Sequence, residues 1–260
     1  MTNREKYKFE DFTLANYKHL IEIAKEKGFE FILHKDNFVE NRKDIIWRHD
    51  VEFSPDIALE MAIIENELGV KATYFFQMHT PYYNTFDKHY TDILYKIQDL
   101  GHHIGLHFDS HYFDVKSEEE LDKYIFIDKK YMEDVLKIEI DTFSFHNTNP
   151  FILNCKAYKY GGLISVYSSF FKEHYNYCAD STGIWRYDRL EDVLKDESVQ
   201  HLQVLIHDGM WSHEVLSPHK RIMSCIQDSA DRIKSGYMKG LPKTGNINVD
   251  DDEINPMPNF

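Results

Sequence analysis

Clusters of basic residues are what this sequence most clearly lacks. It has 30 Lys and Arg residues against 44 Asp and Glu, which gives a formal net charge of −14, and no Lys/Arg-rich run occurs in it. A phosphate backbone would be repelled by a chain with this charge balance. We therefore expect no nucleic acid among its partners.

Long apolar runs are also absent. No apolar run approaches the roughly 18 residues that a membrane-spanning helix requires. The N-terminus reads Met-Thr-Asn-Arg-Glu-Lys and lacks the apolar segment of a signal peptide. We expect a cytoplasmic protein with no membrane span.

Cysteine is scarce. Cys155, Cys178 and Cys225 are far apart, odd in number and form no Cys-x-x-Cys pair. This pattern indicates neither a disulfide framework nor a cysteine zinc site. We expect buried or idle thiols in a reducing compartment.

What the sequence does contain is an alternation of short apolar runs and amphipathic segments. Hydrophobic residues make up 42% of the chain and aromatic residues 15%, a globular composition that does not favour disorder. Helical spacing and capping residues predict helices over residues 13–28, 54–69, 87–101, 117–136, 189–194 and from 217 onward. Apolar runs predict strands over 29–33, 45–47, 72–77, 104–107, 142–145 and 202–206. The alternation predicts an α/β fold with a parallel sheet, open or closed, and helices outside it.

Four polar clusters directly follow predicted buried strands. They occupy residues 48–52, 107–111, 146–147 and 207–208. The carboxyl ends of parallel strands meet at one face of a sheet or barrel, where sites are assembled. We therefore expect these four clusters to converge.

His107 and His111 are the most distinctive local feature. If the strand gives way to a helical turn after His107, residues four apart lie on one face and both imidazoles reach one ion. Two histidines, a carboxylate and a position left for water make a catalytic type of zinc site. The spacing alone is a weak signal in a chain with 15 histidines.

Asp50 and Glu52 are two residues apart, so on a strand they point to the same side. One carboxylate can then ligate a metal while the other accepts a proton from the bound water. The same pair also suits the preference for negative charge at the start of the helix that begins at Ser54-Pro55. Spacing alone leaves both interpretations open.

These residues together resemble the NodB-like polysaccharide deacetylases, carbohydrate esterases that remove N- or O-acetyl groups from sugars. The resemblance runs from about Trp47 to Trp211, and Asp50-Val51-Glu52 is similar to the first motif of the branch that reads Asp-Val-Asp there. The second to fifth motifs are resembled by residues 101–111, 142–147, 180–186 and 205–207. Several motifs in the right order are more specific than any one of them.

The resemblance implies a distorted (β/α)7 barrel of the glycoside hydrolase/deacetylase type. We assign residues 45–240 to this barrel and residues 1–44 to an N-terminal helix and strand packed on it. Residues 241–260, with three consecutive aspartates and three prolines, are expected to form an acidic C-terminal tail.

The resemblance also implies the roles of five residues. Asp50 is the expected catalytic base and His207 the general acid, while Glu52, His107 and His111 bind a divalent metal, most often Zn²⁺. We expect a hydrolase that removes an acetyl or formyl group from nitrogen by attack of metal-bound water. The expected substrate is an acylated amino-sugar or a glycan precursor.

Five further residues are predicted to bind the substrate, namely His146, Asn147, Tyr83, Trp185 and Arg186. The sequence departs from the family pattern at Glu52, where Asp is usual, and at Asn147, which stands where the third motif has an arginine. Arg48 and Arg186 are two possible replacements for that arginine. These departures leave two alternatives, another amide hydrolase such as a deformylase or ring-opening amidohydrolase, and a non-catalytic carbohydrate-binding or assembly protein.

Overall fold

One nine-stranded sheet organises residues 1–240, the part of the chain that this computed structural model describes. Its strands are β1 (Glu30–Ile32), β2 (Asp44–Val51), β3 (Thr73–Gln77), β4 (His103–Asp109), β5 (Thr142–His146), β6 (Lys159–Tyr160), β7 (Leu163–Ser165), β8 (Asn176–Ala179) and β9 (His201–His207). The strand order is β6-β7-β5-β4-β3-β2-β9-β8, and β1 pairs with β2 beside this path. Neighbouring strands are parallel except for β6 and β7.

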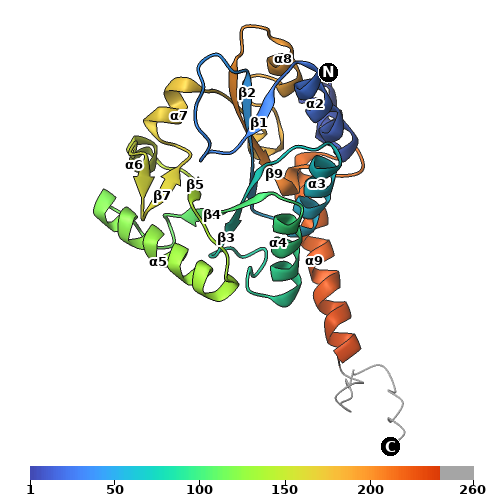
Figure 1. Ribbon diagram of the computed structural model, residues 1–260. Helices are drawn as coiled ribbons and strands as arrows, with labels where there is room; N and C mark the ends of the chain where they lie inside the picture. Colours follow the sequence, from blue (N-terminus) through green and yellow to red (C-terminus); the bar gives the residue numbers. More distant parts are fainter. Residues whose placement is uncertain (241–260) are drawn as a thin grey trace, which may run out of the picture.

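Helices surround the sheet, which curls into part of a barrel (Figure 1). They are α1 (Asn3–Lys6), α2 (Leu14–Glu26), α3 (Pro55–Glu67), α4 (Lys88–Asp99), α5 (Glu118–Leu136), α6 (Pro150–Asn154), α7 (Ser169–His174), α8 (Leu190–Lys195) and α9 (Pro218–Gly240). Within residues 1–240 no strand pairing joins β8 to β6 or β7, and we call this open side of the curl the seam. The α/β prediction is confirmed, and the curled sheet is consistent with the predicted distorted barrel.

The long helices begin at the positions that the capping pattern of the sequence predicts. The hydroxyl of Thr13 accepts a hydrogen bond from the backbone N–H of Asn16, and Ser54 caps α3 in the same way with Pro55 at the first helical position. The side chains of Asp87 and Ser117 cap α4 and α5. Local capping chemistry therefore sets most of the helix starts.

Residues of β2 alternate between the two faces of the sheet. Trp47 and His49 face outward, where the indole N–H of Trp47 donates to the Tyr17 hydroxyl of α2 at 2.8 Å and His49 lies 3.1 Å from the same oxygen. Arg48 and Asp50 consequently face the inside of the curl, and both are buried. The inner face of β2 thus carries buried charged groups toward its carboxyl end, while Ile46 on the same face belongs to a small apolar cluster.

Three short strands and three short α-helices were not predicted from the sequence. β6, β7 and β8 have two to four residues each, and α1, α6 and α7 have four, five and six. Segments of this length do not show a periodicity that identifies their structure. The C-terminal tail predicted for residues 241–260 lies outside the described residues, and the predicted domain limits stay a prediction.

The composition led to expectations about the cysteines and about membrane-spanning helices, and the structure describes both features. The three cysteines are buried and unpaired. None of the helices described between residues 1 and 240 combines the length and apolar character needed to cross a membrane.

Gly105 in β4 allows Phe75 to fill the inside of the curl. A Cβ atom at Gly105 would lie 2.5 Å from Cε1 of Phe75 and 3.1 Å from the carbonyl oxygen of Thr142. We expect Gly105→Ala to lower the free energy of unfolding by about 1–3 kcal/mol through overpacking. Urea denaturation measures this change.

Gly236 in α9 provides the matched control, because a Cβ atom there meets no other atom within 4 Å. Alanine is the better helix former, so Gly236→Ala should leave stability unchanged or raise it by up to about 1 kcal/mol. Equal effects of the two substitutions would contradict the packing argument.

Candidate metal centre

The carboxyl ends of four parallel strands bring the candidate site residues together. Glu52 directly follows β2, His107 lies near the end of β4, and His146 and His207 are the last residues of β5 and β9. The order β5-β4-β3-β2-β9 places these strand ends along one rim of the curl. The predicted convergence of the polar clusters is therefore what the fold produces.

Glu52, His107 and His146 form a cluster with a donor set suited to a metal ion. Oε1 of Glu52 lies 3.0 Å from Nε2 of His107 and 2.8 Å from Nδ1 of His146. The three potential ligand atoms all lie within 4.8 Å of one another. Two imidazole nitrogens and a carboxylate oxygen are the protein ligands of many catalytic zinc sites. The cluster fits a divalent ion such as zinc, and its donor types do not identify which one binds.

His146 occupies the third position of this cluster, for which the sequence had suggested His111. His111 is exposed, and its Nε2 lies 2.7 Å from the backbone oxygen of Asn147. The HxxxH spacing brings both imidazoles to one ion only if a helical turn follows His107. Instead β4 continues to Asp109 and a turn follows, so residues 107 and 111 do not share a helix face.

A hydrogen-bonded relay orients His107. The Ser144 hydroxyl donates to Oδ1 of Asp50 at 2.9 Å, and its oxygen lies 2.6 Å from Nδ1 of His107. Since the single hydroxyl proton is directed at Asp50, Nδ1 of His107 must carry a proton and donate to Ser144. The other nitrogen, Nε2, then points its lone pair at Glu52 unless it is also protonated. Either a proton or a cation has to lie between Nε2 and the Glu52 carboxylate.

Ser144 was not among the site residues predicted from the sequence, although the alternation of β5 places it on the same face as His146. Residues 142–146 read Thr-Phe-Ser-Phe-His, and this alternation places Ser144 and His146 on the same face of β5. The two phenylalanines are buried on the other face. Ser144 thus belongs to the inner face by the same period-2 rule that pairs Asp50 with Glu52.

Arg48 is the arginine next to the predicted base. Its Nη2 lies 3.7 Å from Oδ2 of Asp50, and both side chains are almost fully buried. Arg186 is exposed, with its guanidinium 5.8 Å from the ring centre of Tyr187. Of the two replacements considered for the third-motif arginine, the structure places Arg48 beside Asp50.

Asp180 fixes the position of the His207 imidazole. Nδ1 of His207 lies 2.6 Å from Oδ1 of Asp180, and Asp180 also accepts the indole N–H of Trp211 at 2.8 Å. Nε2 of His207 is 4.0 Å from Oε1 of Glu52. Burial acts to lower the pKa of His207, but the Asp180 carboxylate outweighs it and raises that pKa to about 10.

The cluster also changes the acidity of Glu52 and His146. Burial acts to raise the pKa of Glu52, yet hydrogen bonds from His107 and His146 hold it well below its usual range. Burial acts to lower the pKa of His146, and the hydrogen bond and charge of Glu52 raise it instead. Glu52 is therefore a carboxylate, which is the form that ligates a cation.

Three residues predicted to bind substrate have structural contacts. The Tyr83 hydroxyl donates to the backbone oxygen of Val51 at 2.6 Å and accepts the backbone N–H of Gln77, so it ties together the ends of β2 and β3. Trp185 stacks on Phe12 at a ring distance of 5.2 Å. Asn147, at a positive φ of 46°, places Nδ2 2.7 Å from Nε2 of His146. Their roles in substrate binding stay predictions.

Asp208 shapes the turn that carries Glu52. Its carboxylate accepts the backbone N–H of Glu52 at 2.8 Å and that of Ser54 in a shorter hydrogen bond. Asp208 is fully buried, which raises its pKa. The acidic residue after His207 is therefore a positioning residue for Glu52.

Comparisons with known proteins found similar chains among solved structures alone. No protein-family model and no curated protein sequence matches the chain. A family 4 carbohydrate esterase from Bacillus anthracis is similar in structure, at 16% identity over 83% of this chain and 86% of that chain, with a TM-score of 0.38. A mutant of the peptidoglycan deacetylase PdaC from Bacillus subtilis has 15% identity over 80% and 99%, with a TM-score of 0.42.

A family 4 pseudoenzyme from Bacillus anthracis is also similar, at 13% identity over 75% of this chain and 63% of that chain, with a TM-score of 0.38. The chain is thus structurally similar, at low sequence identity, to polysaccharide deacetylases of carbohydrate esterase family 4. Likenesses of this size concern the fold and carry no argument about activity. Function has to be inferred from the side chains of this chain.

Metal binding by histidine variants tests the composition of the cluster. We expect His146→Ala to lower the affinity for Zn²⁺ by more than about 100-fold, because loss of a hydrogen bond to a ligand alone costs about 10- to 100-fold. His111→Ala should change it by less than a few fold. Metal content after gel filtration, measured by plasma mass spectrometry, gives the stoichiometry.

Both histidines lie at the rim, so circular dichroism should show an unchanged fold for each variant. Loss of zinc in His111→Ala together with its retention in His146→Ala would favour the ligand set suggested by the HxxxH spacing.

Proposed function

We propose that this protein is a metal-dependent hydrolase that removes an N-acyl group, acetyl or formyl, from a carbohydrate or sugar conjugate. The observation that carries the proposal is the relay from Asp50 through Ser144, which directs Nε2 of His107 at the Glu52 carboxylate. Because Nε2 and the carboxylate oxygen are 3.0 Å apart, a proton or a cation has to lie between them. We propose that a divalent metal held by Glu52, His107 and His146 takes that position.

The metal would supply a Lewis acid beside the acyl carbonyl. Asp50 lies behind His107, with its carboxylate charge balanced by Arg48 at 3.7 Å. In the proposed reaction Asp50 accepts the proton released by the attacking water. Because Asp50 is buried, bulk water does not contact the carboxylate that accepts this proton.

His207 would provide the second proton transfer. Amide hydrolysis needs an acid that protonates the leaving nitrogen. Nε2 of His207 lies 4.0 Å from Oε1 of Glu52, and Asp180 holds the ring through Nδ1. His207 on β9 is the register partner of Asp50 on β2. We therefore propose Asp50 as the proton acceptor and His207 as the proton donor, on neighbouring strands beside one metal position.

The sugar class in this proposal rests on the resemblance of the sequence motifs to those of the NodB-like deacetylases. The acyl group, the identity of the metal and the cytoplasmic location stay predictions. A non-catalytic carbohydrate-binding or assembly protein is the alternative that the activity test has to separate.

Release of acetate or formate from a panel of N-acylated amino sugars tests the proposal. The panel should contain free, nucleotide-linked and oligomeric N-acetyl and N-formyl amino sugars, incubated with the zinc- or cobalt-loaded full chain. We expect release by the wild type and a loss of about 10²- to 10⁴-fold in kcat for His207→Ala, the usual contribution of a general acid.

His213→Ala is the matched control, because His213 is an exposed histidine paired with Glu60, outside the cluster. It should retain full activity, and His207→Ala should retain its metal. A stoichiometric metal with no release from any substrate of the panel would favour the non-catalytic alternative.

The pH dependence of the reaction tests the role of Asp180. Asp180 raises the pKa of His207 to about 10, so His207 is protonated at neutral pH and loses its proton only as the pH rises through that value. Asp180→Asn removes the raising charge, which lowers the pKa of His207. We expect the alkaline limb of kcat/KM to move to lower pH, with activity partly recovered on the acidic side.

An alkaline limb at the same pH in Asp180→Asn and wild type, in a variant that still binds metal, would argue against His207 as the acid.

A further inference from the structure

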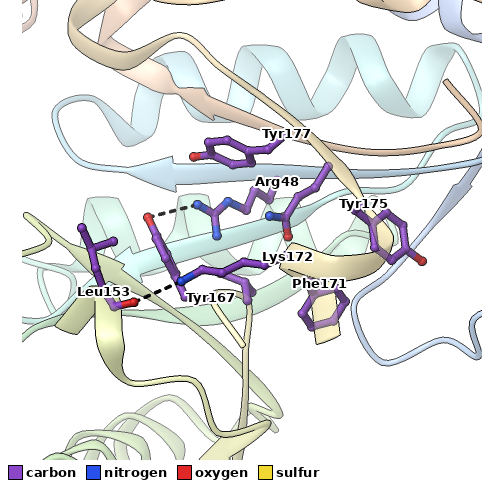
Figure 2. A pocket seen from close by; sticks show the side chains of 9 residues that line it. Arg48, Leu153, Tyr167, Phe171, Lys172, Tyr175 and Tyr177 are labelled. Carbon is purple, nitrogen blue, oxygen red and sulfur yellow. Dashed lines mark hydrogen bonds between the residues drawn. The ribbon is translucent and has the colours of Figure 1, made fainter. Parts of the chain in front are cut away.

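A cavity of about 280 Å³ lies along the seam of the sheet, separate from the metal cluster. Tyr177 of β8 lines it on one side, and Tyr167 and Phe171 from the segment after β7 line it on the other (Figure 2). Arg48 of β2 lies between these walls (Figure 2). We call this space the seam cavity.

Arg48 is an incompletely paired buried cation in this cavity. Its side chain is 1% exposed, and within residues 1–240 neither Nε nor Nη1 has a hydrogen-bond partner. Nη2 donates to the Tyr167 hydroxyl at 3.4 Å and lies 3.7 Å from Asp50, which is too long for a hydrogen bond. A buried guanidinium with free donors is costly unless an acceptor reaches it.

The charge of the seam cavity is opposite to that of the chain. Of the described residues that line it, Arg48 and Lys172 are the charged ones, and both are cationic. Lys172 is exposed and contacts the backbone oxygen of Leu153 at 3.3 Å rather than a carboxylate. Asp50, 3.7 Å from Arg48, does not line the cavity but offsets part of this charge. The exposed cation of Lys172 still leaves the lining positive in a chain with a net charge of −14, which favours an anion.

The walls indicate what kind of anion fits. The aromatic rings of Tyr167, Phe171, Tyr175 and Tyr177 line the space around the guanidinium. Aromatic walls with one placed charge are typical of sites for small organic ligands. A carboxylate carries a single charge and matches one planar guanidinium, whereas a phosphate dianion would need more donors to replace its hydration.

We propose that the seam cavity binds a small organic carboxylate, with its charged group on Arg48 and its apolar body between the aromatic side chains. Glu52, His107 and His146 do not belong to the residues that line the cavity. Carboxylate binding there therefore does not require the metal cluster, although Arg48 also lies 3.7 Å from Asp50.

Calorimetric titration of the metal-free full chain with benzoate tests the proposal. Chelator treatment is needed first, because carboxylates also bind zinc, and the ionic strength is held constant. We expect saturable one-to-one binding of benzoate. Benzyl alcohol, the neutral counterpart, should bind at least about 10-fold more weakly, because a hydrogen bond to a charged group contributes about 1.5–3 kcal/mol.

Three variants locate the binding. Lys172→Met should weaken benzoate binding by about two- to five-fold, the range expected for an exposed charge. Lys96→Met is the matched control, since Lys96 is exposed on α4 and does not belong to the residues that line the cavity; it should bind benzoate like the wild type. His146→Ala removes a residue of the metal cluster that does not belong to the relay beside Arg48, and it should also leave benzoate affinity unchanged.

Equal affinity for benzoate and benzyl alcohol, no saturable benzoate binding up to tens of millimolar, or loss of binding in His146→Ala would each overturn the proposal. A crystal grown with 4-bromobenzoate gives a direct readout, because anomalous scattering from bromine should appear beside Arg48. Bromine found only at the metal cluster would overturn the proposal equally.

Discussion

The direction of one hydroxyl proton underlies the chemistry inferred for this protein. Ser144 donates to Asp50, and therefore accepts from His107, so that one nitrogen of the imidazole is left to face Glu52. This contact requires a proton or a cation between the imidazole nitrogen and the carboxylate oxygen. The three buried side chains of the relay, Asp50, Ser144 and His107, thus create a position beside Glu52 that favours a positive charge.

The charged inner face of β2 connects the two inferred sites. Asp50 contributes to the relay, and Arg48, two residues earlier on the same face, contacts both Asp50 and the wall of the seam cavity. Because side chains of a strand alternate, β2 and the residue after it present Arg48, the predicted base Asp50 and the proposed metal ligand Glu52 in that order. The same period leaves His49 on the outer face, where it pairs with Glu65 of α3.

Much of the fold could be predicted from local signals. Capping residues such as Thr13 and Ser54 set helix starts, and buried apolar runs marked the central strands. Of the candidate site, the convergence of Glu52, His107 and His207 followed from parallel topology. His111 was suggested by spacing that holds only on a helix, and His146 replaces it in the cluster because β4 remains extended through Asp109. The strands β6 to β8 were too short to be predicted.

The sequence by itself determined which side chains share a face, because the periods of strands and helices are local properties of the backbone. Alternation alone places Asp50 with Glu52, and Ser144 with His146. Only the tertiary structure decided which residues meet across strands, since strand order and strand length depend on packing between distant segments. The pairing of β4 with β5 brings Ser144 beside His107, and the open seam between β8 and β7 leaves space next to Arg48.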